Sequence, residues 1–151
     1  SAGLLLFDRV APGQSSDIWS LRLDGPENAK PLVAGPTDER WGQLSPDGRW
    51  LAYTSDESGR REVYVRRVDG AGSRAQVSTA GGTYPRWRRD GRELFFVSPM
   101  NRMIATPITL ADDGATLGTP VDLFPARPFQ GFDRWFYDVA PDGRFLLAAV
   151  P

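Results

Sequence analysis

Three short segments of this 151-residue chain combine arginine with aromatic side chains. Arginine and large aromatic residues are enriched at binding hot spots, because they join a large contact area to directed hydrogen bonds. The candidate partner- or ligand-binding residues are Arg40, Trp41, Tyr84, Arg86, Trp87, Phe132, Arg134 and Trp135. If the arginines converge, we expect them to attract an anionic group, and an arginine that is withdrawn from water otherwise needs a carboxylate partner.

The tryptophans in these segments also have a purely structural interpretation. Trp41, Trp87 and Trp135 can pack between repeated units of the fold, where a large apolar ring stabilises the core without binding anything. The sequence leaves both roles open for the tryptophans, and both an anion and a carboxylate partner open for the arginines.

The composition removes most catalytic chemistry. The chain has no His and no Cys, so histidine bases, Ser-His-Asp triads and thiolate chemistry are excluded. The acidic pairs Asp56-Glu57 and Asp112-Asp113 lack the alternating ligands and closing Glu of a calcium loop. Paired carboxylates for glycoside hydrolysis stay possible, because their spacing is spatial, although most acidic residues fall in turns. We therefore expect no enzyme, no catalytic residue, no metal site and no cofactor.

Charge and hydropathy limit the classes of partner that the chain is expected to bind. The chain has 18 basic and 19 acidic residues, a net charge of -1 and no long block of one sign, so we expect no nucleic-acid partner. No apolar run approaches the roughly 20 residues that a spanning helix needs, so we expect no membrane insertion.

A repeated phrase predicts the elements that position these residues. Asp-Gly-Arg occurs at residues 47–49, 90–92 and 142–144, each time followed by a strand-like run. Asp-Gly between two such runs favours a β-hairpin turn of type I′ or a related type, with a positive φ at the glycine. Recurrence at intervals of 43 and 52 residues indicates a repeated supersecondary unit.

The strand pattern predicts an all-β chain of about three four-stranded antiparallel units. No stretch has a helical apolar period. The predicted units span residues 1–35, 42–79 and 84–125, followed by a partial unit at 136–151. The first unit lacks its innermost strand and the last has only two strands.

This pattern resembles the TolB-like, WD-type β-propeller repeat, also described as WD40-like or PD40-like. The resemblance is carried by LSPDGRWLAYTSDESGRREVYVRRVDG at 44–70 and YPRWRRDGRELFFVS at 84–98. It is closest to the C-terminal propeller blades of bacterial Ser/Thr kinase-associated proteins, a group that FYDVAPDGRFLLAAV at 136–150 also resembles. The third unit departs from the repeat, because Met103–Pro107 replaces a Tyr-rich third strand, and nothing resembles a kinase.

The resemblance implies a non-catalytic module for recognition of a protein or a small anionic ligand, in a periplasmic or other extracytoplasmic location. The alternatives are a fragment of a propeller glycosidase or lactonase, or the regulatory propeller of a serine peptidase. Closed propellers have four to eight blades, so we expect either part of a longer ring or a homodimer whose two arcs complete one.

Overall fold

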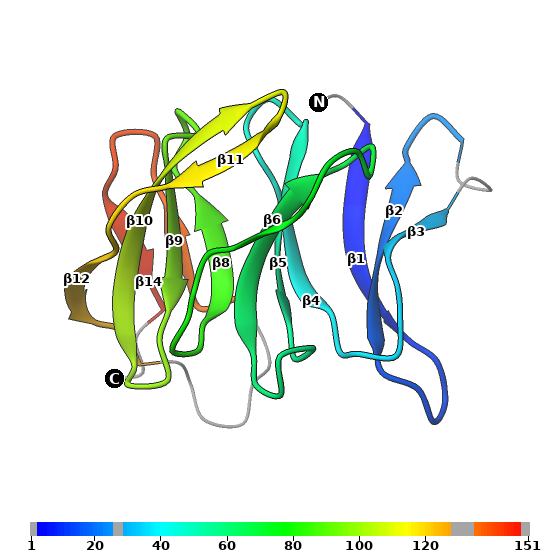
Figure 1. Cartoon of the computed structure of the whole chain (residues 1–151), viewed down its shortest axis with the longest axis horizontal. Helices are drawn as coiled ribbons and strands as arrows, with labels where there is room; N and C mark the ends of the chain where they lie inside the picture. The colour runs from blue at the N-terminus through cyan, green and yellow to red at the C-terminus, as the bar shows by residue number, and fades with distance from the viewer. Residues whose placement is uncertain (1–2, 26–28, 128–134, 149–151) are drawn as a thin grey trace.

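The structure, a computed structural model, describes residues 3–25, 29–127 and 135–148, and every regular element in these ranges is a β-strand (Figure 1). The first sheet contains β1 (Leu4–Val10), β2 (Ser16–Arg22) and β3 (Lys30–Val33). The second contains β4 (Arg40–Leu44), β5 (Trp50–Ser55), β6 (Glu62–Arg67) and β7 (Ala75–Gln76). The third contains β8 (Thr83–Trp87), β9 (Glu93–Val97), β10 (Arg102–Ala111), β11 (Gly114–Leu117) and β12 (Val121–Pro125). The last pair is β13 (Tyr137–Val139) and β14 (Phe145–Leu147).

Each sheet is a meander in which sequential strands pair antiparallel, except that β11 and β12 both pair with β10. The sheets follow one another across the molecule like the blades of a propeller (Figure 1). The predicted all-β fold and partial propeller are confirmed. The blade boundaries stay a prediction.

The Asp-Gly turns join the first two strands of a blade. The glycines have positive φ, 70° at Gly48, 71° at Gly91 and 85° at Gly143, as the sequence predicts. The prediction of a type I′ turn is wrong. A type I′ turn needs a positive φ at both Asp47 and Gly48, and only Gly48 has one. The Gly48 N–H donates to the Ser45 carbonyl at 2.8 Å, which closes the turn one residue earlier. The chain makes a type I turn and then places glycine in the left-handed region.

Neighbouring blades bury their faces against each other, which is what a stack of repeated sheets requires. Ile18 of β2 packs with Leu51, Tyr53 and Tyr64 of the second blade. Gly42 allows the close approach, since a Cβ there would lie 2.9 Å from the Ile18 Cγ2 atom. Two further clusters join the second blade to the third and the third to β13 and β14.

Candidate functional site

An aromatic column lies where the innermost strands begin. Trp41, Tyr84 and Phe136 occupy the same position relative to the three Asp-Gly turns. The Trp41 and Tyr84 ring centroids are 4.2 Å apart, and those of Tyr84 and Phe136 are 5.6 Å apart. All three side chains are buried in one core cluster. The repeat therefore places one aromatic ring from each successive blade in continuous contact.

Two members of this column have a strained backbone. Trp41 has φ of 56° and Tyr84 has φ of 55°, values that bulky residues rarely adopt. Each lies at an irregularity in the pairing of its strand, within β4 and β8 respectively. Such strain persists only where the surroundings hold it.

The contacts that hold it come from other blades. The Trp41 N–H donates to Asp8 Oδ2 of β1 at 3.1 Å. The Tyr84 carbonyl accepts from the Tyr137 hydroxyl at 2.6 Å. Burial raises the pKa of Tyr137 well above its ordinary value, so this hydroxyl remains a donor at neutral pH.

A polar row runs beside the column, again at equivalent positions of the three inner strands. Arg86 Nη1 donates to Gln43 Oε1 at 2.9 Å, and Arg86 Nε lies 3.8 Å from Asp138 Oδ1. The Arg86 guanidinium lies 4.0 Å above the ring of Trp135. Among the described residues, the buried Arg86 Nε has no hydrogen-bond partner. Arg86 Nε is therefore a buried donor that faces Asp138 without a hydrogen bond, on a side chain that is partly exposed and lies against an aromatic ring.

A small cavity of about 180 Å³ adjoins this row. It is lined by Leu6, Phe7 and Asp8 of β1, by Trp41, Gly42 and Gln43 of β4, and by Trp135. Trp135 thus borders the cavity and also stacks with Arg86. The cavity can accept a short polar group beside an aromatic surface, and its one charged lining residue is Asp8.

Arg40 has a different environment from Arg86. Its Nε donates to Asp38 Oδ2 at 2.8 Å, and Arg61 Nη2 lies 3.0 Å from the same oxygen. Burial alone would raise the pKa of Asp38, but hydrogen bonds from Arg40 and the Ser16 N–H, with both nearby arginine charges, hold it below its ordinary value. The Arg61 guanidinium also lies 4.9 Å from the Trp41 ring.

The structure brings Trp41, Tyr84, Arg86 and Trp135 together. Trp87 belongs to the core cluster between the second and third blades, although its Nε1 donates to the Gln43 carbonyl at 3.1 Å. Phe132 and Arg134 lie outside the described residues. The role of these eight residues in binding stays a prediction.

Sequence reasoning missed four residues of the site, Asp8, Gln43, Phe136 and Asp138. The sequence contains a signal for three of them, Gln43, Phe136 and Asp138. Counting back from each Asp-Gly pair aligns Gln43 with Arg86 and Asp138, and aligns Phe136 with the aromatic column. Asp8 carried no such signal, because it lies on β1, outside the strands that precede the three Asp-Gly turns.

Comparisons with known proteins support a TolB-like propeller. No family model matches the chain. An uncharacterized protein, Atu1656, from Agrobacterium fabrum is 29% identical over 138 residues, covering 86% of this chain and 45% of that protein. Tricorn protease homolog 2 of Streptomyces coelicolor, a provisional designation, is 32% identical over 136 residues, covering 90% of this chain and 10% of that protein. The chain thus spans less than half of either relative.

Solved structures agree with this result. A candidate TolB from Agrobacterium tumefaciens superimposes with a TM-score of 0.61 at 26% identity, covering 81% of this chain and 46% of the other. TolB from Acinetobacter baumannii superimposes with a TM-score of 0.59 at 18% identity, covering 93% of this chain and 33% of the other. The chain thus has a TolB-like propeller fold, and its closeness to kinase-associated blades stays a prediction. Within the described ranges, no helix has the length and hydropathy to cross a membrane.

Proposed function

We propose that this chain is a non-catalytic recognition module that binds an anionic group, carried by a protein or a small ligand, at Arg86 and Trp135. One observation carries the proposal: the buried Arg86 Nε has no hydrogen-bond partner among the described residues, while the guanidinium lies over an aromatic ring. Because Arg86 Nε is buried, an incoming carboxylate would reach this donor by displacing Asp138, whose side chain is 65% exposed and whose Oδ1 lies 3.8 Å away.

The test uses a capped peptide, Ac-Gly-Glu-Glu-Gly-NH2, with its Gln counterpart as the uncharged probe. Binding is followed by tryptophan fluorescence, because Trp135 lies against Arg86. Arg86→Gln should weaken binding of the Glu peptide by about 10-fold or more, the value of one charged hydrogen bond. Raising the salt concentration should weaken binding to the unmodified protein.

Arg89→Gln is the matched control, since it removes the same charge from an exposed position in the turn after β8. It should leave the affinity nearly unchanged. Equal losses in the two variants would show that net charge attracts the peptide, which would contradict a site at Arg86.

A second candidate function is the accessory propeller of a peptidase. The observation that favours it is the 32% identity to the Streptomyces tricorn protease homologue, of which this chain matches a tenth. In that case the full-length gene product should cleave labelled casein and lose this activity to a serine-directed inhibitor. Absence of cleavage by the full-length product would remove this candidate.

The location and assembly belong to the same proposal. TolB-like resemblance favours an extracytoplasmic location. The first sheet has no partner beyond β1 and the last contains only β13 and β14 in the part of the chain described here, so two copies could complete one ring. Sedimentation at micromolar concentration tests this: a dimer supports closure by a second copy, and a monomer with both terminal sheets ordered contradicts it.

A further inference from the structure

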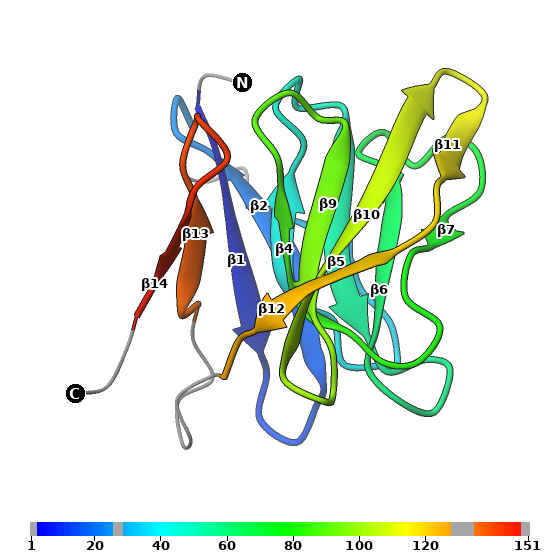
Figure 2. The same cartoon turned by 90° about the vertical axis from the view of Figure 1, so that its left-hand side faces the viewer.

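The strand β10 extends beyond its neighbour β9. The β9–β10 ladder ends at the pair Pro107↔Glu93, followed by one bond from the Ile108 N–H to the Arg92 carbonyl at 2.9 Å. Figure 2 shows the end of β10 diverging from β9, while β11 folds back along it. The last residues of β10 are therefore paired on the β11 side only, within the described chain.

The register identifies which backbone groups are unpaired. The Gly118 N–H donates to the Pro107 carbonyl at 2.8 Å, and Thr109 pairs with Thr116 two residues further along. In an antiparallel ladder, hydrogen-bonded and non-hydrogen-bonded pairs alternate. The backbone N–H and C=O of Thr109 therefore point toward β11, and those of Leu110 point away from it. The N–H and C=O of Leu110, and the C=O of Ile108, thus form an open strand edge.

This edge faces a groove of about 470 Å³. Ser45, Pro46 and Asp47 line it from the first hairpin of the second blade, and Asp90, Gly91 and Arg92 line it from that of the third. Residues 107–110 of β10 complete the lining. A volume of this order accommodates a short peptide segment or small ligand.

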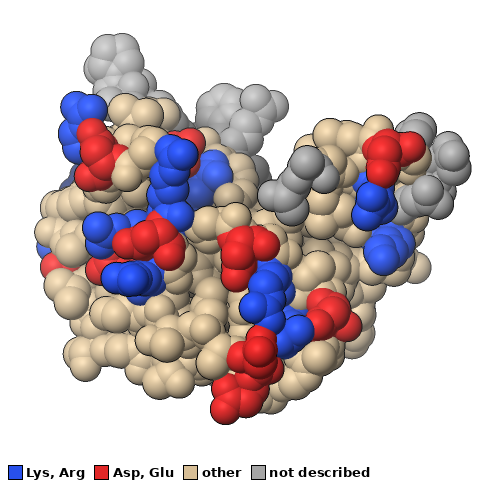
Figure 3. Space-filling view, turned by 90° about the horizontal axis from the view of Figure 1, so that it is seen from above, with Lys and Arg blue, Asp and Glu red and all other residues tan. Residues whose placement is uncertain are grey.

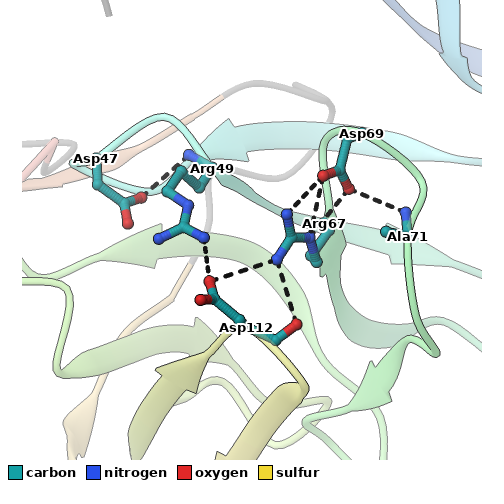
Figure 4. Close-up of polar contacts among 6 residues, drawn as sticks. All are labelled: Asp47, Arg49, Arg67, Asp69, Ala71 and Asp112. Atoms are coloured by element: carbon teal, nitrogen blue, oxygen red, sulfur yellow. Dashed lines mark hydrogen bonds and ion pairs between the residues drawn. The ribbon is translucent and has the colours of Figure 1, made fainter.

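The extended end of β10 is held in place across the blades. Asp112, after the end of β10, forms ion pairs with Arg49 and Arg67 of the second blade, and the Arg67 Nη1 donates to the Asp112 carbonyl at 3.3 Å (Figure 4). Asp69 fixes Arg67 through a contact of 2.6 Å. On the apolar side, Leu110 packs against the core cluster between the second and third blades. The open edge is therefore supported at its end and along its side, so little order needs to be gained on binding.

The groove lining also has a charge preference. Two of its three charged side chains are carboxylates, Asp47 and Asp90, and Arg92 is the third. Burial would raise the pKa of Asp47, but hydrogen bonds from Ser45 Oγ and the Arg49 N–H hold it below its ordinary value, so the carboxylate is ionised at neutral pH. The wider face mixes both signs (Figure 3), so this preference is local to the groove.

We propose that this groove binds an extended peptide segment that carries a basic side chain, by adding a strand to the Ile108–Leu110 edge of β10. The peptide backbone bonds to the open N–H and C=O groups, and the lysine or arginine lies against Asp47 and against Asp90, where it competes with Arg88 at 3.4 Å. This site is separate from the one proposed at Arg86, because neither Arg86 nor its neighbours Gln43, Trp135 and Asp138 line the groove.

Amide hydrogen exchange of the protein alone gives the first test. The Leu110 amide should exchange rapidly and the Thr109 amide slowly, because only the second has a ladder partner. Protection of Leu110 equal to that of Thr109 would show that the edge is already covered and would overturn the proposal.

The second test is a titration with the capped pentapeptide Ac-Thr-Val-Lys-Val-Thr-NH2, followed by amide chemical shifts. Leu110 and Gly91 should shift and the Trp135 indole should not. A peptide with Glu in place of Lys should bind about 3-fold or more weakly, in the range of exposed ion pairs. Shifts confined to Trp135, or no preference between the peptides, would overturn the proposal.

Two variants of Leu110 distinguish the contribution of its backbone N–H from that of its side chain. Leu110→Pro removes the edge donor, whereas Leu110→Ala keeps it and removes the same packing. The Pro variant should lose binding by about 10-fold relative to the Ala variant and remain folded, since proline is tolerated where the N–H faces outward. Equal binding by the two variants, or unfolding of the Pro variant alone, would show that the Leu110 N–H does not face the groove. Arg86→Gln should bind the Lys peptide normally, which distinguishes this site from the proposed anion site.

Discussion

Replacing Tyr137 with Phe removes one hydroxyl that joins β13 to the third blade. This hydroxyl donates to the Tyr84 carbonyl at 2.6 Å and lies 3.3 Å from the Phe95 carbonyl, and it is buried. The substitution loses one net hydrogen bond and leaves a buried carbonyl less satisfied, so we expect the free energy of unfolding to fall by about 2 kcal/mol. For a chain of this size the melting temperature should fall by roughly 4–8 °C.

Urea unfolding followed by tryptophan fluorescence measures this loss. Tyr64→Phe is the matched control, because its hydroxyl interacts with Ser58 in an exposed loop, and it should cost less than about 0.5 kcal/mol. Equal effects of the two substitutions would refute the reasoning that the Tyr137 bond fastens the blades.

The pH dependence gives an independent check. The pKa of Tyr137 is raised well above 10 in the folded protein because burial disfavours the phenolate. Its contribution to stability is therefore complete below the unfolded pKa near 10 and is lost as the pH rises above it. The Phe variant should show a smaller loss of stability above pH 10 than the unmodified protein.

Three further predictions concern the turns and the inter-blade contacts. Gly48→Val and Gly91→Val should each destabilise by more than about 1 kcal/mol in urea unfolding, because φ is 70° and 71°, and a neutral effect would contradict the turn geometry. The carboxyl of Asp69 should titrate with a pKa of about 2, because Arg67 and the Ala71 N–H bond to it. Its stabilising effect should be present above the unfolded pKa and lost as the pH falls toward 2, while Arg67→Gln should raise that pKa in carbon-detected NMR. Asp112→Asn should speed amide exchange in β11, because it removes the ion pairs of the extension, and unchanged exchange would show that apolar packing alone holds it.

The fold could be predicted from the sequence because its signal is local and repeated. Each Asp-Gly pair combines a glycine that tolerates positive φ with strand-like runs on both sides, and three copies define the repeat. The turn type was harder, because type I′ and type I followed by a left-handed glycine share the same dipeptide. The φ of Asp47 and the hydrogen bond from the Gly48 N–H to the Ser45 carbonyl distinguish them in the structure.

The site was predictable in residue type but not in register. Grouping Arg40 with Arg86 by similar local sequence joined residues at different positions in their strands, whereas the distance from the Asp-Gly turn aligns Gln43 with Arg86. The positive φ of Trp41 and Tyr84 could not be predicted, because contacts from Asp8 and Tyr137 in other blades hold it. Tertiary contacts here override local preference.

The hairpin of β10 and β11 shows the same limit. The sequence shows Asp112-Asp113 only as an acidic pair, whereas the structure places it in the turn between β10 and β11. Asp112 reaches partners in the preceding blade, Arg49 and Arg67, that are 63 and 45 residues earlier in the chain. Nothing in the local sequence carries that information.

The Arg86 Nε–H resonance tests the central claim most directly, because the proposed recognition function rests on this buried donor, which makes no hydrogen bond among the described residues and lies 3.8 Å from Asp138. Titration with Ac-Gly-Glu-Glu-Gly-NH2 should shift this resonance and the Trp135 indole resonance along one binding curve, and the Gln peptide should leave both in place. Binding of the Glu peptide that leaves the Arg86 Nε–H unchanged would contradict the account.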